Sequence, residues 1–349
     1  MSSVELRKVE KHFAGGVVAV DAIDLDVPDG AFVTLLGPSG CGKTTTLRMV
    51  AGLETPTGGE IRIKGQRVNE TPIHQRNLGM VFQNYALFPH KSIFDNVAFG
   101  LKYRGVTKAD IAERVTRALD IVRLPGVEGR FPTQLSGGQQ QRIALARALV
   151  IEPDVLLLDE PLSALDANLR EEMRGEIKAI QQRIGVTAIF VTHDQGEALA
   201  MSDLVVVMNK GRIEQRGAPA EVYEHPQSEF VANFLGNANF LPGKVIAVNG
   251  KRISVALGDG ARIDVADAAR ALQAGEGVNV IVRAEKIELG RGALTGTIAA
   301  VDYLGSTARY DVVLSGGQKV TALATIRDGA RRVGEAVSLS IAAEHCRIL

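Results

Sequence analysis

The sequence has little cysteine, no net charge and no long apolar run. Its two cysteines, Cys41 and Cys346, stand far apart, so they give no disulfide framework or Cys-x-x-Cys metal site and fit a reducing compartment. The 40 lysines and arginines balance 40 aspartates and glutamates, which gives no electrostatic reason to expect nucleic acid as a partner. Purely apolar runs, such as residues 155–158, have the length of a core strand, whereas a bilayer span needs roughly 20 apolar residues. The first residues, MSSVELRKVEKHF, lack the apolar stretch of a secretory signal, so we expect the protein in the cytoplasm.

The composition that remains is typical of a globular protein with two domains. Of its 349 residues, 46% are hydrophobic and 23% charged. Up to about Gly236, short apolar runs alternate with helical patterns, which predicts an α/β core around a largely parallel sheet. Residues 31–36 (AFVTLL) predict a buried strand that a glycine-rich turn joins to a helix, and residues 155–158 and 188–192 predict two more strands.

Two of the predicted helices have recognisable ends. Thr107 opens a T-x-x-D pattern ahead of Ile111 and further apolar residues at helical spacing, which is typical of a capping box before an amphipathic helix. A second apolar repeat begins at Leu169, recurs every three or four residues and stops at Gly185, the usual place of a C-terminal glycine.

In the last third of the chain, alternating patterns replace helical ones and predict a small β-rich domain over residues 237–349. The predicted strands are residues 245–248, 253–257, 263–265, 278–282, 297–301 and 309–314. Asn249-Gly250 is a hairpin signal between the first two of them. Two similar segments, GKVIAV at 243–248 and GTIAAV at 296–301, indicate a weak internal repeat and favour two related barrel-like halves.

The first motif is a phosphate-binding loop. Residues 37–44, GPSGCGKT, fit G-x-x-x-x-G-K-[ST] between a predicted strand and a predicted helix. Its glycines let backbone N–H groups turn towards phosphate oxygens, and the helix adds its positive N-terminal end. We expect Lys43 to reach the β- and γ-phosphates, the Thr44 hydroxyl to bind Mg²⁺, and Cys41 to act as a small filler. The predicted nucleotide-binding residues of this segment are Gly37, Pro38, Ser39, Gly40, Cys41, Gly42, Lys43, Thr44 and Thr45.

The second motif places two acids at the end of a strand. In VLLLDEP, residues 155–161, four apolar residues precede Asp159 and Glu160. Paired with a phosphate loop, the carboxylate of Asp159 is expected to hold Mg²⁺, through water. Glu160 is then placed to orient or deprotonate the attacking water, which is the role of a general base.

The third motif, LSGGQ at residues 135–139, precedes the helical QQRIALARALV. Ser136 and Gln139 have the S-x-x-Q spacing of a capping box, and Gly137 and Gly138 leave the helix N-terminus open to a phosphate. Because the chain already has a phosphate loop for one nucleotide, a second phosphate-facing helix end predicts a head-to-tail pair of subunits. Each nucleotide would then lie between the phosphate loop of one subunit and LSGGQ of the other.

These motifs, followed in order by His193, resemble the nucleotide-binding subunits of ATP-binding-cassette (ABC) transporters over about residues 4–236. The resemblance implies that Gln83, in VFQNYALFPH, touches Mg²⁺ and the attacking water and senses the membrane subunit. It implies that His193, in FVTHD, contacts the γ-phosphate, and that Asp166, which ends the SALD loop, crosses the dimer interface. Phe13 stands where the family places an aromatic residue, often tyrosine, under the adenine ring.

The resemblance also implies a reaction cycle and partners. Two ATP molecules with Mg²⁺ would close a homodimer, and hydrolysis would reopen it and drive two transmembrane permease subunits, served by a periplasmic or extracellular solute-binding protein. The protein would lie peripherally on the cytoplasmic face of the cell membrane and bind no nucleic acid. Near Gln83, Tyr85 and Phe88, an exposed YALFPH run would suit docking by a membrane subunit, although the same cluster would equally suit a buried core.

The last third of the chain, residues 237–349, indicates a particular group within this family. NANFLPGKV, VRAEKIEL and VDYLGSTARYDVV resemble the OB-like accessory domain, of the TOBE type, in maltose, polyamine and ferric-iron importer ATPases. Relatives usually have proline where this chain has Ala284, which leaves a ligand role of that segment open. VFQ, YALFPH and NVAFGL are most similar to the spermidine/putrescine importers, so a polyamine is the expected cargo, with ferric iron, a sugar or another organic solute as alternatives.

Other classes explain less of the sequence. Soluble ABC ATPases of DNA repair or chromosome organisation insert long coiled coils or zinc-binding cysteines before LSGGQ, and the segment between Thr44 and Leu135 has neither. A small-molecule P-loop kinase would leave Gln83, the SALD loop and His193 unexplained. We therefore expect an α/β P-loop ATPase over residues 1–236, with a helical subdomain at about 88–152, followed by the all-β domain.

Overall fold

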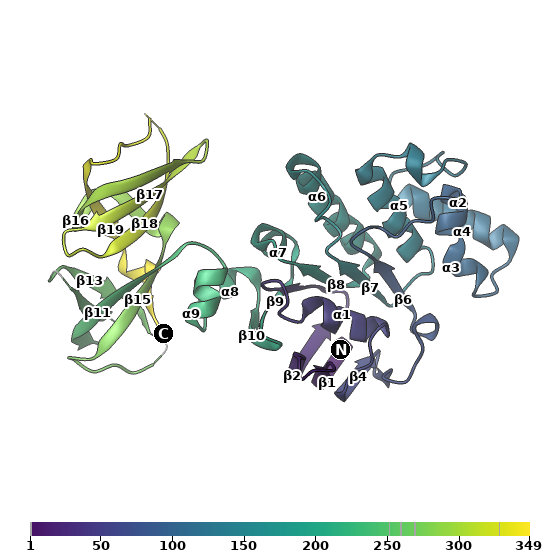
Figure 1. The fold of residues 1–349 in the computed structure, drawn as a ribbon, viewed down its shortest axis with the longest axis horizontal. Coiled ribbons are helices and arrows are strands. Elements are labelled where there is room, and N and C mark those ends of the chain that lie inside the picture. Colours follow the sequence, from purple (N-terminus) through teal and green to yellow (C-terminus); the bar gives the residue numbers. More distant parts are fainter. Residues whose placement is uncertain (1, 251, 259, 269, 328) are drawn as a thin grey trace. The chain divides into compact units, whose positions relative to one another are not determined.

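The computed structural model describes residues 2–250, 252–258, 260–268, 270–327 and 329–349. The chain separates into two compact units, Met1–Glu224 and His225–Leu349, which are drawn in Figure 1. The predicted domain boundary at Gly236 falls inside the second unit and stays a prediction. Every helix among the described residues is too short or too polar to span a lipid bilayer.

A six-stranded sheet forms the core of the first unit, in the order β10-β9-β3-β8-β7-β6. Its strands are β3 (Phe32–Leu36), β6 (Leu78–Val81), β7 (Val155–Asp159), β8 (Thr187–Thr192), β9 (Leu204–Asn209) and β10 (Arg212–Gly217). All are parallel except β10, an edge strand that runs antiparallel to β9. The three predicted strands are confirmed as β3, β7 and β8, with β8 between the other two. Their carboxyl ends share one edge of the sheet, where α/β proteins bind ligands.

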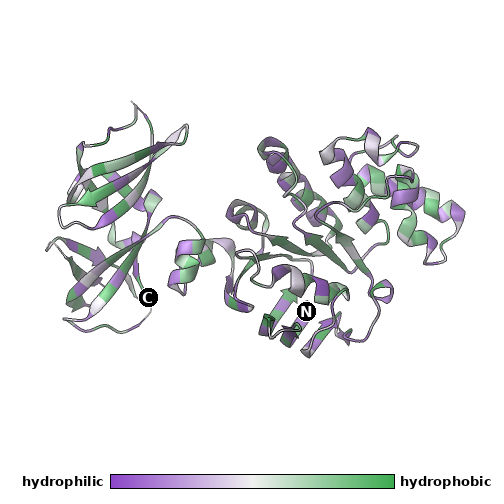
Figure 2. Ribbon diagram, viewed as in Figure 1, coloured by the Kyte–Doolittle hydropathy of each residue, from purple (hydrophilic) through white to green (hydrophobic). Residues whose placement is uncertain are grey.

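Both faces of the inner part of this sheet are covered, which explains why strands β3, β7, β8 and β9 are mostly apolar, whereas the edge strand β10 is mostly polar. Along β7, Val155 and Leu157 belong to one hydrophobic core, and Leu156 and Leu158 to the other, with the period of two that a strand imposes. Figure 1 shows α1 (Lys43–Ala51) below the sheet, and α6 (Ala167–Ile184) and α7 (Gln195–Met201) above it. In Figure 2 the inner strands of this sheet are green over most of their length, whereas the surrounding helices alternate between green and purple.

A second, antiparallel sheet covers the opposite side of α1. Its strand order is β2-β1-β4-β5. The strands are β1 (Ser2–His12), β2 (Val18–Pro28), β4 (Gly58–Ile63) and β5 (Gln66–Arg67). Apolar side chains of this sheet share one core with α1 and the six-stranded sheet, so the helix that follows the phosphate loop is packed between two sheets.

Between β6 and β7 the chain is helical, and these helices lie beside the β6 edge of the sheet in Figure 1. They are α2 (Ile93–Val97), α3 (Phe99–Lys102), α4 (Lys108–Ile121), η2 (Pro132–Gln134) and α5 (Gly137–Leu149). The remaining helices of the unit are η1 (Ile73–Gln75) and α8 (Pro219–Glu224). Thr107 accepts a hydrogen bond from the backbone N–H of Asp110, which confirms the predicted start of α4. Gly185, with a φ of 71°, follows the last residue of α6 and confirms its predicted end.

Arg76 is buried at the C-terminal end of α1, and the acceptors of its hydrogen bonds are backbone carbonyls. Its Nε donates to Thr71 O at 2.8 Å, and its Nη1 donates to Met49 O at 2.8 Å and Val50 O at 2.9 Å. The carbonyls at a helix C-terminus carry partial negative charge and have no partner within the helix, so a cation there is stabilising.

Replacing Arg76 by Met should lower the free energy of unfolding by roughly 3 kcal/mol, because buried carbonyls would lose their donors. Urea denaturation followed by circular dichroism measures the change. Arg67→Met is the matched control, since Arg67 is exposed and paired with Glu70, and a surface ion pair contributes about 1 kcal/mol or less. Equal losses in the two variants would contradict a capping role for Arg76.

The second unit contains two sheets, in the orders β13-β12-β11-β15-β20-β14 and β18-β17-β16-β19. The strands are β11 (Ala238–Asn249), β12 (Arg252–Leu257), β13 (Arg262–Val265), β14 (Asp267–Ala268), β15 (Gly277–Arg283), β16 (Ile287–Tyr303), β17 (Thr307–Leu314), β18 (Lys319–Thr325), β19 (Ala336–Ile341) and β20 (Cys346–Ile348). The helices are α9 (Glu229–Phe234), η3 (Ala284–Lys286) and η4 (Ala343–His345). One hydrophobic core contains side chains of both sheets.

The predicted internal repeat has a structural counterpart. Residues 243–248 lie in β11 and pair with β12, and residues 296–301 lie in β16 and pair with β17, so each segment opens an antiparallel hairpin. In both hairpins the register shifts after the third residue of the repeat, Val245 in one and Ile298 in the other. An equivalent bulge at equivalent positions is a feature that related segments keep. The six predicted strands are confirmed, and Asn249 pairs with Arg252 across the predicted hairpin turn.

Candidate nucleotide-binding site

The phosphate loop lies where the sequence predicts it, between β3 and α1. A Cβ atom on Gly37 would collide with the carbonyl oxygen of Met208, and one on Gly42 with that of Ala19. Gly42 also has a φ of 103°, which residues with a side chain rarely adopt. The glycines are therefore required both by close backbone approach and by the conformation of the loop. Together with Ala19 and Glu160, residues 39–45 line a pocket of about 190 Å³.

Lys43 is buried inside this loop. Its Nζ donates to the carbonyl oxygens of Gly37 at 2.7 Å and Pro38 at 2.9 Å, and lies 3.7 Å from the sulfur of Cys41. The ammonium group is thus held by the loop itself, at the N-terminal end of α1. Burial raises the pKa of the Cys41 thiol, so that side chain is uncharged and packs in the core beneath the loop.

Asp159 and Thr44 bring two oxygen atoms together beside the loop. The Thr44 hydroxyl donates to Asp159 Oδ1 at 3.2 Å, and Asp159 itself is buried at the end of β7. Burial raises the pKa of Asp159, whereas the Thr44 hydrogen bond and the charge of Arg48, 4.0 Å from Oδ2, act in the opposite direction. A buried carboxylate next to a hydroxyl suits a small divalent cation, which prefers oxygen ligands.

Glu160 and His193 meet at the ends of the neighbouring strands β7 and β8. Glu160 Oε2 lies 3.2 Å from His193 Nδ1, and the Glu160 side chain is mostly covered while that of His193 is more than half exposed. Glu160 has a φ of 44°, a left-handed conformation that is unusual for a residue with a side chain. Its backbone N–H donates to Val191 O, which fixes the turn. Strained backbone at the end of a strand is common at functional sites.

Gln83 and the SALD loop adjoin these acids. Gln83 is exposed, and its Nε2 donates to the Ser163 hydroxyl at 3.2 Å. Ser163 in turn donates to the carbonyl oxygen of Glu160 at 2.9 Å. A chain of two hydrogen bonds therefore joins the glutamine loop to the predicted general base. Neither sequence motif predicts this contact, because it joins residues that are 80 positions apart.

The LSGGQ segment has the predicted capping box. The backbone N–H of Gln139 donates to Ser136 Oγ at 3.4 Å, and the Ser136 N–H donates to Gln139 Oε1 at 3.0 Å. Ser136 and Gly137 are exposed, and Gly138 is buried against Leu169. Asp166 caps α6, since its Oδ1 accepts from the Leu169 N–H at 3.0 Å.

Two aromatic residues of the prediction lie in different surroundings. Phe13 is 41% exposed, and Lys11 Nζ lies 4.9 Å from the centre of its ring. The Phe13 ring is therefore accessible at the surface, beside the N-terminal strands. Tyr85, predicted with the exposed docking run, is only 8% exposed and belongs to the core of the helical region. Of the two alternatives that the sequence leaves open, the buried one therefore holds at Tyr85, whereas Ala86 is exposed.

No sequence motif indicates the charged network that lies next to His193. Thr192 donates to Glu197 Oε2 at 2.5 Å, and Glu197 is buried, which raises its pKa. Arg170 lies 3.9 Å from Glu197 Oε1 and 3.8 Å from Asp194 Oδ2. These side chains surround a small hollow beside Glu160 and His193 and so contribute to the position of the histidine loop.

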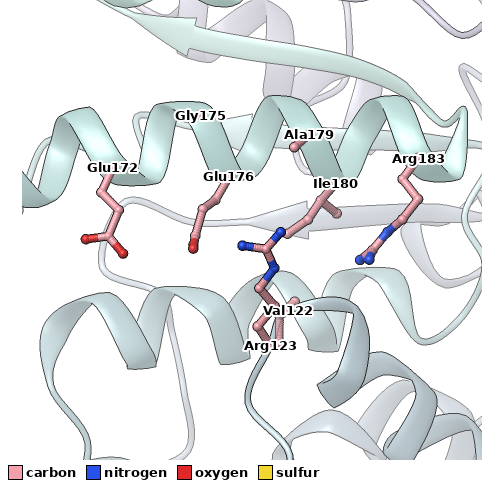
Figure 3. A pocket seen from close by; sticks show the side chains of 8 residues that line it. All are labelled: Val122, Arg123, Glu172, Gly175, Glu176, Ala179, Ile180 and Arg183. Carbon is pink, nitrogen blue, oxygen red and sulfur yellow. The ribbon is translucent and has the colours of Figure 1, made fainter.

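A larger pocket, of about 460 Å³, lies away from the motifs, between the end of α4 and α6. Figure 3 shows Arg123 directed towards the α6 side chains, with Glu172 and Glu176 along one wall. Both carboxylates are already paired with Arg142, at 3.0 and 2.8 Å. Two paired acids are unsuited to phosphate, so this pocket does not compete with the phosphate loop as a nucleotide site.

Comparison with protein families gives two matches. A family described as "ABC transporter" matches residues 20–163, and one described as "TOBE domain" matches residues 280–349. The first range contains the phosphate loop, LSGGQ and both motif acids, and the second contains all four strands of the β18-β17-β16-β19 sheet as well as β20. The predicted fold class, a P-loop ATPase followed by an all-β OB-like domain of the TOBE type, is confirmed.

Similar proteins span nearly the whole chain. The spermidine/putrescine import ATP-binding protein PotA of Rubrobacter xylanophilus is 49% identical, over 99% of this chain and 93% of that protein. The PotA of Thermobifida fusca is 48% identical, over 89% and 83%. The Fe(3+) ions import ATP-binding protein FbpC 1 of Rhizobium meliloti is also 48% identical, over 90% and 89%.

Solved structures agree with the first unit. The ATP-binding cassette MJ0796, in a dimeric post-hydrolysis structure bound to ADP and Pi, has a TM-score of 0.56 and 31% identity, covering 62% of this chain and 98% of that chain. The cbiO1 protein of Clostridium perfringens, part of the ABC transporter complex cbiONQ, has a TM-score of 0.59 and 30% identity, covering 63% and 90%. With these motifs, this geometry and relatives of similar length, the chain belongs to the ABC transporter family, as one of its ATP-binding import subunits.

Proposed function

We propose that this protein is the ATP-hydrolysing subunit of a polyamine importer and works as a dimer. The observation that carries the proposal is full-length similarity, at 46–49% identity, to spermidine/putrescine import ATP-binding proteins. The catalytic groups described above support the ATPase activity that this family has. A ferric-iron importer ATPase at 48% identity makes ferric iron the second candidate cargo.

The residues in and around the phosphate loop have different roles in ATP binding and hydrolysis. Residues 37–45 bind the phosphates of ATP, and Lys43 exchanges its carbonyl acceptors for phosphate oxygens. Phe13 stacks on the adenine, which its exposed ring allows. Thr44 and Asp159 would hold Mg²⁺, because their adjacent oxygen atoms fit that ion, and Gln83 would contribute its amide oxygen. When bound, the ion neutralises charge on the phosphates.

Glu160 accepts the proton of the attacking water, and His193 orients the Glu160 carboxylate and contacts the γ-phosphate. The separation of 3.2 Å between Glu160 Oε2 and His193 Nδ1 supports this division of roles. Gln83 orients the water. Its hydrogen bond to Ser163, which in turn bonds the Glu160 backbone, holds the Gln83 amide and Glu160 at a constant distance from each other. General bases act within hydrogen-bond distance of the proton they remove.

The second half of each site comes from a second copy of the chain. Ser136, Gly137, Gly138 and Gln139 bind the γ-phosphate of the partner's ATP at the N-terminal end of α5, and Asp166 lies at the same interface. The exposure of the capping box supports this placement, as does the dimer that MJ0796 forms. Two permease subunits and a solute-binding protein complete the importer, with this chain peripheral on the cytoplasmic face of the membrane.

Reconstitution of the chain with its permease and binding protein in proteoliposomes tests the cargo. Spermidine or putrescine should stimulate ATP hydrolysis and enter the vesicles, with Glu160→Gln as the inactive control. Stimulation by ferric iron, or by a sugar, without response to polyamines would contradict the polyamine assignment and leave the ATPase role standing. ATP hydrolysis that ignores every solute would contradict the import function itself.

A further inference from the structure

His193 lies in the short turn between β8 and α7, and more than half of its side chain is exposed. Because an exposed ring has few packing partners, the position of the imidazole depends on the backbone on either side of it. Thr192, the last residue of β8, precedes His193, and Asp194, the N-cap of α7, follows it. Thr192 is buried and pairs with Leu36 of β3, so the turn starts from a fixed point in the sheet.

A ring of three hydrogen bonds closes around His193. The Thr192 hydroxyl donates to Glu197 Oε2 at 2.5 Å and accepts from the Asp194 N–H at 3.0 Å. The Glu197 N–H donates in turn to Asp194 Oδ1 at 2.9 Å. The two residues on either side of His193 are therefore bound to each other and to the first turn of α7.

This ring differs from an ordinary capping box. In a capping box, the side chain of the third helical residue bonds directly to the backbone N–H of the N-cap residue. Asp194 and Glu197 have that spacing, but the Thr192 hydroxyl lies between the Asp194 N–H and the Glu197 carboxylate. Capping of α7 alone does not require this hydroxyl. Its place in the ring extends the cap to the strand that ends beside His193.

The carboxylate of Glu197 is buried, with 4% of the residue exposed. Removing a carboxylate from water is unfavourable unless hydrogen bonds and cations compensate for the lost hydration. Arg170 supplies a cation from α6, since its Nε lies 3.9 Å from Glu197 Oε1, and its Nη2 donates to Leu165 O at 3.0 Å. Glu197 is thus held between α6 and the end of β8, at a place where an apolar side chain would pack at lower cost.

Groups that take part in a reaction must keep their positions closely, since a displacement of about 1 Å can lower a rate by about 10²-fold. We infer that Thr192 and Glu197 are positioning residues for ATP hydrolysis. The hydrogen bond between them fixes the turn of His193 and so holds its imidazole beside Glu160. The inference rests on the proposed function, in which His193 and Glu160 act on ATP.

The test compares Thr192→Val, which removes the hydroxyl at nearly constant shape, with Thr192→Ser, which keeps it. Thr187→Val is the matched control, because Thr187 is buried at the other end of β8. Its hydroxyl likewise accepts from a backbone N–H, that of Gly30, and donates to a carboxylate, that of Asp29. The measurements are kcat and KM of ATP hydrolysis and the equilibrium affinity for ATP.

Thr192→Val should lower kcat by about tenfold or more and leave the affinity for ATP within about twofold of wild type, because the site binds ATP but holds His193 loosely. Thr192→Ser should keep kcat within about threefold, since its hydroxyl can still donate to Glu197. Thr187→Val should hydrolyse ATP as wild type does.

The His193 imidazole gives a readout that a merely structural role would not change. The chain has six histidines, and with isotope-labelled histidine their ring signals are observed by NMR. The His193→Gln variant identifies the His193 signal by its loss. Thr192→Val should shift or broaden this signal, whereas Thr187→Val should leave it unchanged.

A normal kcat or an unchanged His193 signal in Thr192→Val would overturn the inference. An equal fall of kcat in Thr192→Val and Thr187→Val would also overturn it, because that is the result of a general loss of stability. Glu197→Met removes the acceptor of the same hydrogen bond, so adding it to Thr192→Val should lower kcat no further than the larger single effect. Losses that multiply would contradict a shared role, whereas normal hydrolysis by Glu160→Gln would refute the proposed function instead.

Discussion

Replacing Glu160 by Gln is expected to lower the rate of ATP hydrolysis by about 10²–10⁴-fold while leaving ATP binding intact. The amide has nearly the size and shape of the carboxylate, so it keeps the left-handed turn at φ 44° and the approach to His193. It cannot accept the proton of the attacking water. ATP then stays unhydrolysed between the subunits, and the closed dimer accumulates.

The measurements are the steady-state ATPase rate, equilibrium ATP binding, and the ATP-dependent shift to a dimer in size-exclusion chromatography. Glu172→Gln is the matched control, because Glu172 is an exposed carboxylate of α6 that pairs with Arg142 and lies outside the site. The control should hydrolyse ATP at close to the normal rate. A normal rate in Glu160→Gln as well would remove Glu160 from the role of general base.

The local parts of the site could be predicted from the sequence because local chemistry dictates them. The phosphate loop brings its backbone close to Met208 and Ala19, so only glycine fits at positions 37 and 42. The two glycines in the sequence therefore indicate this close approach. The capping box at Ser136 and Gln139 is likewise a contact between residues three positions apart. Strand β7 is recognisable because both of its faces are buried, which makes its first four residues apolar.

What could not be predicted depends on packing between distant segments. The sequence leaves open whether Tyr85 is exposed or buried, and only its packing in the core of the helical region decides between the two. In the sequence, Arg147 looks like an ordinary cation in the last turn of a helix. Its hydrogen bonds to Tyr85 and Ala86 join residues about 60 positions apart, so no local pattern predicts them. The Arg170–Glu197 network arises only when α6 and α7 pack together.

The second unit likewise contains strands that a local pattern indicates and strands that only pairing with distant residues explains. The strands β14 and β20 contain two and three residues, and they are too short to give a pattern of their own. They exist because they pair with each other and because β20 pairs with β15. By contrast, β19 has an alternating AVSLSI pattern that by itself indicates a strand.

Adding Ser136→Arg to the Glu160→Gln background is expected to abolish the ATP-dependent dimer while each monomer binds ATP as before. The arginine places a large side chain beside Gly137 and Gly138, where the partner's γ-phosphate should lie. It also removes the cap on Gln139 and puts a cation at the positive end of α5, which together cost about 1–2 kcal/mol of helix stability. Size-exclusion chromatography with and without ATP measures the dimer, and nucleotide binding to the monomer is measured separately.

Ser136→Ala separates the two effects, because it removes the same cap without adding bulk or charge. If loss of the cap alone prevented dimerisation, Ala and Arg would be equally damaging; we expect Ala to retain part of the dimer. Lys43→Ala gives the opposite pattern, since it weakens ATP binding within the monomer itself. A Ser136→Arg monomer that had lost its ATP affinity would place Ser136 at the nucleotide of its own subunit, because a contact made only across the interface cannot change binding before the interface forms.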